Sequence, residues 1–199
     1  CIAYIDAQIA KILDQLKALD LDDNTIIILW GDHGFHLGDH GLWCKHTNFE
    51  NATRVPLIIS APQSKRNTTS TMPVELTDLF PTLCELAEIE TPNNLDGVSL
   101  VATLNKGNDD IREFALSQYP RYQHMGYALR TERFRYVAWY ANQKDQGADG
   151  HTAPVSTELY DYKLDPLEKR NLANEAAYAK ISQDLGTQLT QFLQHYTQK

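Results

Sequence analysis

The sequence has few cysteines, no long apolar run and no excess of positive charge, and each shortage excludes a class of protein. Three cysteines in 199 residues cannot form the dense disulfide framework of a small secreted domain, and at most one pair is possible. No apolar stretch is long enough to span a membrane, and no signal peptide is present. The net charge of −8 argues against a nucleic acid as the partner.

The chain is nevertheless large and apolar enough to fold around a real core. It is 42% hydrophobic, which suits one or two compact units, and it shows no internal repeat or low-complexity segment. Its first residues already follow a helical pattern, with no capping residue ahead of Cys1. We therefore expect a fragment, a processed chain or a truncated form. Because the chain is acidic, an anionic substrate would need a local positive patch.

The most informative stretch starts with a continuous apolar run from Ile26 to Trp30, rich in β-branched side chains. Such a run is typical of a strand buried on both faces, as in a parallel sheet. The tetrapeptide Gly31-Asp32-His33-Gly34 follows at once. Ligands of open α/β sheets bind at the carboxyl ends of strands, and glycines let the backbone approach them closely. We therefore expect Asp32 and His33 to face a cleft.

Four of the seven histidines lie between His33 and His46, a concentration that an ordinary surface loop seldom has. Asp32 is a hard oxygen ligand that suits Ca²⁺ or Mg²⁺, whereas the imidazole of His33 suits Zn, Mn or Fe better. Spacing alone therefore does not choose a metal. The plainer alternatives are a structural loop with chance histidines and a capping pair at the strand end.

The periodicity around this loop predicts an α/β unit. Apolar residues at helical spacing before the strand predict a helix, from Ile5 through Ile9, Ile12 and Leu16 to Leu19. After the loop, residues 55 to 60 form a second predicted strand. A further helix opens at Thr77 or Asp78, with Pro81 tolerated in its first turn.

The glycine-, asparagine- and aspartate-rich stretch from 105 to 110 is the predicted subdomain boundary. Strand-like segments follow it at 114–119, 126–130, 134–140 and 159–161. The second and third flank Thr131-Glu132-Arg133, a predicted hairpin loop. A last amphipathic helix carries Ile181, Leu185, Leu189 and Tyr196. We predict two domains, residues 1–105 of α/β class and residues 106–199 of α+β class.

The same residues carry a resemblance to a known family. The segment GDHGFHLGDHGLWCKHTNFE, residues 31–50, resembles the second metal-and-sulfate segment of the formylglycine-dependent sulfatases, which belong to the alkaline phosphatase superfamily. It is most similar to the iduronate-2-sulfatase branch. Segments at 4–9, 53–58, 158–161, 165–166 and 171–172 agree. The resemblance implies the C-terminal part of a sulfatase-type sandwich with a mixed central sheet. A small α+β subdomain with an antiparallel sheet and a closing helix would follow.

The resemblance also implies a chemistry: hydrolysis of a sulfate ester, on a sugar of an acidic polysaccharide. It implies Ca²⁺ as the metal, with Mg²⁺ or Mn²⁺ less favoured, and Asp32 as ligand with His33 beside it. Many family members carry asparagine in place of His33. Lys45 would contact the sulfate and, with His33, serve catalysis. Substrate binding would involve His36, His40 and His46 together with Lys45.

One part of the family's machinery is absent from the sequence. The nucleophile is a formylglycine made from Cys or Ser in a Cys/Ser-x-Pro-x-Arg motif, and Cys44 fails the motif at His46 and Asn48. The paired aspartates of the family's N-terminal segment are absent too. We therefore expect the N-terminal part of the same enzyme, on a separate chain or a missing segment, as partner. The resemblance implies a secreted, periplasmic or lysosomal location.

Substrate contacts outside the loop and the reaction class both have alternatives. Four arginines, together with the polar loop from Asn142 to Thr157, could touch an acidic polysaccharide, because arginine binds sulfate and carboxylate bidentately. They could equally alternate outward on strands: Arg121, Arg130, Arg133 and Arg135.

A phosphomonoester or phosphonate hydrolase of the same superfamily is one alternative function. A non-catalytic, metal-stabilised module is another. The single Lys45 favours sulfate.

Overall fold

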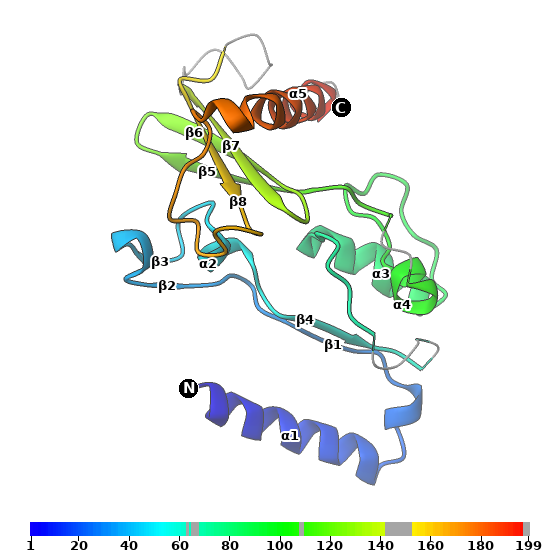
Figure 1. Ribbon diagram of the computed structural model, residues 1–199. Coiled ribbons are helices and arrows are strands. Elements are labelled where there is room, and N and C mark those ends of the chain that lie inside the picture. The colour runs from blue at the N-terminus through cyan, green and yellow to red at the C-terminus, as the bar shows by residue number, and fades with distance from the viewer. Residues whose placement is uncertain (63, 65–67, 108–109, 142–152, 197–199) are drawn as a thin grey trace. The chain divides into compact units, whose positions relative to one another are not determined.

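The computed structural model describes residues 1–62, 64, 68–107, 110–141 and 153–196 (Figure 1). They form two compact units. The first takes the described residues within 1–30, 56–69 and 77–108, and the second those within 31–55, 70–76 and 109–199. The loop that carries His33, His36, His40 and His46, here called the His-rich loop, therefore belongs to the same unit as the C-terminal sheet. The predicted domain boundary between residues 105 and 106 stays a prediction.

Each unit has its own helices and strands. The first contains α1 (Ile2–Ala18), β1 (Ile27–Trp30), β4 (Leu57–Ser60), α3 (Leu79–Leu86) and α4 (Val101–Lys106). The second contains β2 (His36–Leu37), β3 (Trp43–Cys44), α2 (Glu50–Thr53), β5 (Ala115–Arg121), β6 (His124–Arg130), β7 (Phe134–Ala141), β8 (Ser156–Asp161) and α5 (Ala179–Tyr196). Among the described residues, no helix combines the length and the apolar character that crossing a membrane requires.

The first predicted helix is confirmed as α1, but its apolar face is uncovered. None of its residues is buried, and Ile12 is 65% exposed. An exposed apolar stripe of this kind on a soluble helix usually marks a contact surface. The described residues do not provide the side chains that would cover it.

The prediction of a parallel strand buried on both faces is wrong for β1. It pairs with β4 in antiparallel direction, with Ile27 opposite Ser60 and Trp30 opposite Leu57. Trp30 is 50% exposed. An apolar run indicates that a strand is suited to burial, but it contains no information about the direction of the neighbouring strand, and that is where the prediction failed.

Helix α3 organises the remainder of the first unit. It opens at Leu79 with Pro81 in its first turn, as predicted. The buried carboxylate of Asp78 accepts the N–H of Val98 at 2.9 Å, and the buried hydroxyl of Thr82 accepts the N–H of Leu100 at 2.9 Å. Residues 95–100 therefore form an irregular segment fixed by side chains of α3 and the turn before it.

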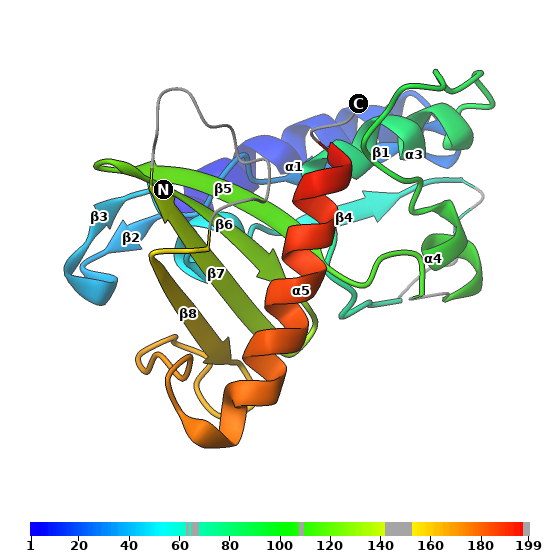
Figure 2. The ribbon, with the colours of Figure 1, turned by 90° about the horizontal axis from the view of Figure 1, so that it is seen from above.

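The second unit is built on an antiparallel sheet with strand order β5-β6-β7-β8. The predicted hairpin loop at residues 131–133 is confirmed between β6 and β7. Helix α5, the predicted final helix, lies across one face of this sheet (Figure 2). Leu129, Tyr136 and Leu159 of the sheet pack there against Leu189 and Leu193 of the helix. This packing forms the main core of the unit.

The opposite face of the sheet holds the His-rich loop. Buried Asn48 donates from Nδ2 to the carbonyl of Gly126 at 3.2 Å, and its Oδ1 accepts the hydroxyl of Ser117 at 3.0 Å. The ring of Phe49 lies 6.0 Å from that of Tyr160. The loop is thus attached to β5, β6 and β8 through side chains, and the sheet fixes its position.

A buried ion pair lies under the end of this loop. Arg135 donates from Nε to Oε1 of Glu168 at 2.5 Å, and only 1–2% of either side chain is exposed. The guanidinium lies close to the rings of both Phe49 and Tyr160, 4.7 and 4.6 Å from their centroids. Burial acts to lower the pKa of Arg135, but the charge of Glu168, its hydrogen bond and the other neighbouring groups together raise that pKa above its usual value.

Glu168 also holds the helix that follows the loop. Its Oε2 accepts the N–H of Glu50 at the start of α2, at 2.9 Å, and its Oε1 accepts the hydroxyl of Tyr162 at 2.6 Å. Glu50 in turn accepts the Nε–H of Arg130 at 2.7 Å. Glu50 also pairs with Arg54, one turn later, at 3.6 Å. Two buried or half-buried carboxylates therefore join α2 to the sheet.

Replacing Glu168 by glutamine should destabilise the second unit, because the guanidinium of Arg135 would remain buried without its counter-ion. Breaking a buried pair from one side costs about 3–5 kcal/mol. Glu175→Gln is the matched control, since it removes the partner of the exposed Arg170 and should cost about 1 kcal/mol or less. Urea unfolding followed by circular dichroism measures both. Equal losses for the two variants would contradict the role given to Glu168.

Candidate functional site

A short hairpin brings the two ends of the His-rich loop together. β2 and β3 are antiparallel, with His36 opposite Cys44 and Leu37 opposite Trp43. The connection between them uses the left-handed backbone region at Gly38, His40 and Gly41. Because the chain reverses here, Lys45 returns to the start of the loop, where His33 lies.

The site is centred on the contact between His33 and Lys45. Lys45 Nζ lies 2.5 Å from His33 Nε2. Asp32 stands beside them, with Oδ2 3.4 Å from the same imidazole nitrogen and Oδ1 accepting the N–H of His33 at 3.0 Å. The side chain of Asp32 is 84% exposed and that of His33 31%. Three of the predicted site residues are thus brought together, with their polar atoms open to a ligand.

The tautomer of His33 follows from its backbone contact. Its Nδ1 lies 2.8 Å from the carbonyl oxygen of Gly34, which can only accept, so Nδ1 carries the proton. In the neutral ring Nε2 is then an acceptor, and it accepts a hydrogen bond from the ammonium of Lys45. The ring is thereby fixed in orientation, with Nε2 directed at Lys45.

Gly34 fastens this arrangement to α2. Its N–H donates to the carbonyl of Ala52 at 2.8 Å. A Cβ at this position would meet the carbonyl oxygen of Asn51 at 2.0 Å, so only glycine allows so close an approach. The position of His33 therefore depends on α2, which Glu168 holds against the sheet.

His36 has a different environment from the one that the sequence predicts. As a substrate-binding residue it should line a pocket, but it is fully buried, with Nε2 2.8 Å from the hydroxyl of Thr47. That hydroxyl also accepts the N–H of Phe49 at 3.2 Å. Burial, with the neighbouring His40, lowers the pKa of His36, so the ring is neutral at pH 7. His36 supports the loop from inside and has no exposed surface to offer a substrate.

His40 and His46 are exposed, as a substrate-binding role requires. The ring of His40 stacks on Phe49 with centroids 3.9 Å apart and an interplanar angle of 8°. The ring of His46 lies over Tyr119, 6.1 Å between centroids. Their predicted contact with substrate stays a prediction, and both rings are held in place by aromatic neighbours.

The donor set near Asp32 fits part of a calcium site. Ca²⁺ takes about six to eight oxygen ligands, and an exposed carboxylate such as that of Asp32 suits it. Among the residues with described positions, however, no group of three His, Cys, Asp or Glu side chains could enclose a metal ion. The three cysteines, Cys1, Cys44 and Cys84, are free thiols, so no disulfide bond joins them. A bound cation would need further ligands besides Asp32 and His33.

Three of the four arginines considered as polysaccharide contacts pair with carboxylates of the second unit, which favours a structural role for them. Arg130 pairs with Glu50, Arg135 with Glu168, and Arg133 with Asp161 at 2.7 Å. The hydrogen bond from Arg133 holds the pKa of the Asp161 carboxyl below its usual value. Arg121 is exposed. Most of the polar loop from Asn142 lies outside the described residues.

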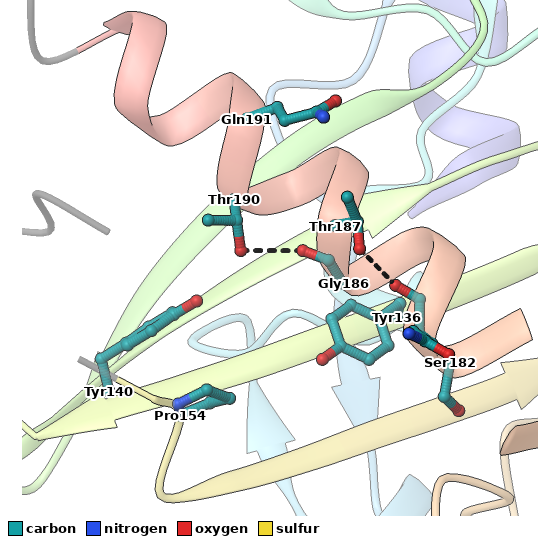
Figure 3. A pocket seen from close by; sticks show the side chains of 9 residues that line it. Tyr136, Tyr140, Pro154, Ser182, Gly186, Thr187, Thr190 and Gln191 are labelled. Carbon is teal, nitrogen blue, oxygen red and sulfur yellow. Dashed lines mark hydrogen bonds between the residues drawn. The ribbon is translucent and has the colours of Figure 1, made fainter. Parts of the chain in front are cut away.

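A pocket of about 330 Å³ between β7 and α5 is a weaker candidate (Figure 3). Tyr136 and Tyr140 line it together with Thr187 and Thr190, and no charged side chain faces it. Burial raises the pKa of both tyrosines, so they stay protonated and offer no nucleophile. The pocket lacks groups for hydrolytic chemistry, and the loop around Lys45 remains the candidate site.

Sequence comparison connects the chain to sulfatases. Residues 1–89 match the family model described as Sulfatase. An N-acetylglucosamine-6-O-sulfatase of Bacteroides thetaiotaomicron is 34% identical, over 91% of this chain and 32% of its own length. Human iduronate 2-sulfatase is 28% identical, over 88% of this chain and 43% of its own length. The chain thus spans between about a third and less than half of these relatives.

Structural comparison agrees over nearly the whole chain. One similar structure is described as a complex with its substrate D-glucosamine-2-N,6-O-disulfate; the TM-score is 0.80, with 28% identity, and the match covers all of this chain and 40% of that one. A phosphonate monoester hydrolase of Agrobacterium radiobacter gives a TM-score of 0.79 and 28% identity, covering 98% of this chain and 40% of that one. With the His-rich loop folded as described and sulfatase relatives along most of its length, the chain belongs to the sulfatase family.

Proposed function

We propose that this chain contributes the sulfate-binding half of a site that hydrolyses sulfate esters of carbohydrates. The observation that carries the proposal is the contact between Lys45 and His33, 2.5 Å apart beside the exposed Asp32. A cation, an oriented imidazole and a carboxylate at one exposed edge suit an anionic ester. The sulfatase relatives along most of the chain support the same reaction class.

Lys45 would hold the sulfate group. Its ammonium has three N–H donors, and His33 uses one, so two remain for sulfate oxygens. As the ester bond breaks, negative charge develops on the sulfate and the leaving oxygen, and a fixed cation lowers the energy of that state more than that of the bound substrate. The hydrogen bond to the imidazole of His33 would keep the ammonium directed at the substrate.

Asp32 would supply one carboxylate to a Ca²⁺ ion, with His33 beside it; Mg²⁺ or Mn²⁺ suits the site less well. Such an ion, when bound, would add positive charge against the sulfate oxygens. The exposure of Asp32 and its place next to the Lys45–His33 pair support this assignment. His40 and His46, exposed around the same loop, would contact the sugar.

The nucleophile would come from elsewhere in the enzyme. The 199 residues contain no Cys/Ser-x-Pro-x-Arg motif, and the relatives are two to three times longer than the part matched here. We propose that an N-terminal part provides the formylglycine and the remaining metal ligands. It would also cover the exposed apolar face of α1. A secreted, periplasmic or lysosomal site of action is part of the same proposal.

The substrate class rests on the relatives and on the charge of the site. The matched relatives are named for sulfated sugars, and one similar structure contains a disulfated glucosamine. A sulfated sugar of an acidic polysaccharide, attacked during polysaccharide degradation, fits the positive charge of Lys45 in an otherwise acidic chain.

The phosphonate monoester hydrolase among the similar structures makes phosphonate or phosphate ester hydrolysis the second candidate. The two functions can be distinguished with the complete enzyme, that is, this chain with its N-terminal part. Its kcat/KM is measured on an aryl sulfate, an aryl phosphonate and an aryl phosphate that share one leaving group. We expect kcat/KM to be highest for the aryl sulfate. A preference for the aryl phosphonate or phosphate would replace the first proposal by the second, and turnover of none of them would favour a non-catalytic module.

In the same enzyme, Lys45→Ala should lower kcat strongly and leave folding intact. Removing one charge-stabilising donor costs about 3–4 kcal/mol, or roughly a hundredfold to a thousandfold in rate. Lys180→Ala, which removes an exposed cation paired with Asp184 on α5, serves as the control and should leave kcat unchanged. Steady-state kinetics on the aryl sulfate measure kcat for both variants and for the wild type. Nearly normal kcat in Lys45→Ala would exclude the sulfate-holding role.

A further inference from the structure

Arg121 differs from the other arginines whose positions the structure describes. Each of the others has a carboxylate oxygen within 4 Å: Arg54, Arg112, Arg130, Arg133, Arg135 and Arg170. Arg121 has no such partner among the described residues, and its guanidinium lies 5.9 Å above the ring of Tyr122, which is 91% exposed.

The strand register places Arg121 on the face of the sheet that carries the His-rich loop. Alternate residues of β5 share a face. Ser117 of this set binds Asn48, and Tyr119 lies under the ring of His46. Arg121 is the next residue of the set and is therefore on the same face, about 7 Å beyond Tyr119.

A second hydrogen-bonding side chain stands beside it. The pairing of β5 with β6 sets Arg121 directly opposite His124. An imidazole N–H can donate a hydrogen bond to an anion next to a guanidinium. We define the hairpin-tip surface as His46, Tyr119, Arg121 and His124. It combines positive charge with an aromatic ring, and it begins one residue after Lys45.

We propose that the hairpin-tip surface binds a second anionic group of the substrate, a carboxylate or a further sulfate on the saccharide whose scissile sulfate Lys45 holds. This inference rests on the proposed function. The planar guanidinium of Arg121 matches either oxyanion bidentately, and Tyr119 and His46 offer ring faces to a sugar. His46 follows Lys45 in the chain and its ring lies over Tyr119, two residues before Arg121, so the second group would be distinct from the sulfate that is hydrolysed.

The complete enzyme tests the assignment with four substrates. One is an aryl sulfate without a second anion, and one is a sulfated neutral sugar. The other two are the same sulfated sugar with a neighbouring carboxylate and with a second sulfate. For Arg121→Gln we expect KM to rise about 10- to 100-fold on the substrates with a second anion, as the loss of a charge-assisted contact predicts. KM and kcat on the first two should not change.

Two further variants sharpen the result. Arg121→Lys should recover part of the affinity, because it keeps the charge and loses the bidentate geometry. Arg170→Gln, which removes an exposed arginine paired with Glu175, should match the wild type on every substrate. Of the two substrates with a second anion, the one whose KM changes more shows whether the surface prefers a carboxylate or a sulfate.

The outcomes separate this inference from the proposed function. If Arg121→Gln behaves as the wild type on all four substrates, or loses activity equally on the aryl sulfate, the hairpin-tip surface has no such role while sulfate hydrolysis stands. If the wild-type enzyme turns over no sulfate ester at all, the proposed function fails and this inference fails with it.

Discussion

The buried pair of Arg135 and Glu168 is the constraint on which the candidate site depends. It joins β7 to the turn after β8, and through the N–H of Glu50 it also holds the first residue of α2. Desolvating two charges is costly, and here the cost is offset by three hydrogen bonds to one carboxylate and by two aromatic rings close to the guanidinium. Glu168 itself adopts a left-handed backbone conformation, which the surrounding contacts must stabilise.

The geometry of the His-rich loop follows from that anchor through short contacts. Glu168 holds α2, α2 receives the N–H of Gly34, and Gly34 fixes the imidazole of His33, which orients Lys45. A mobile lysine would lose entropy on binding sulfate, whereas one already held by an imidazole loses less. The rigid sheet thereby preorganises groups that belong to an irregular segment, as sites on supported loops require.

Sequence reasoning found what local patterns encode and missed what distant contacts decide. The helices α1 and α5 and the hairpin between β6 and β7 follow from apolar periodicity and turn residues. Asp32 and His33 stood out by their place directly after an apolar run, whereas Lys45 was singled out by the family resemblance. The burial of His36 had no local signal, because its neighbour Thr47 lies 11 residues away. Glu168 was missed for the same reason, since 118 residues separate it from Glu50.

The central claim is that this chain carries the sulfate-binding half of a sulfatase site and that an N-terminal part completes it. The most direct test combines the purified chain with that part, carrying formylglycine, and measures sulfate release with Ca²⁺ present. The account predicts no release by either part alone and release by the two together, abolished by Lys45→Ala on this chain. Release by the 199 residues alone, or release that survives Lys45→Ala, would contradict it.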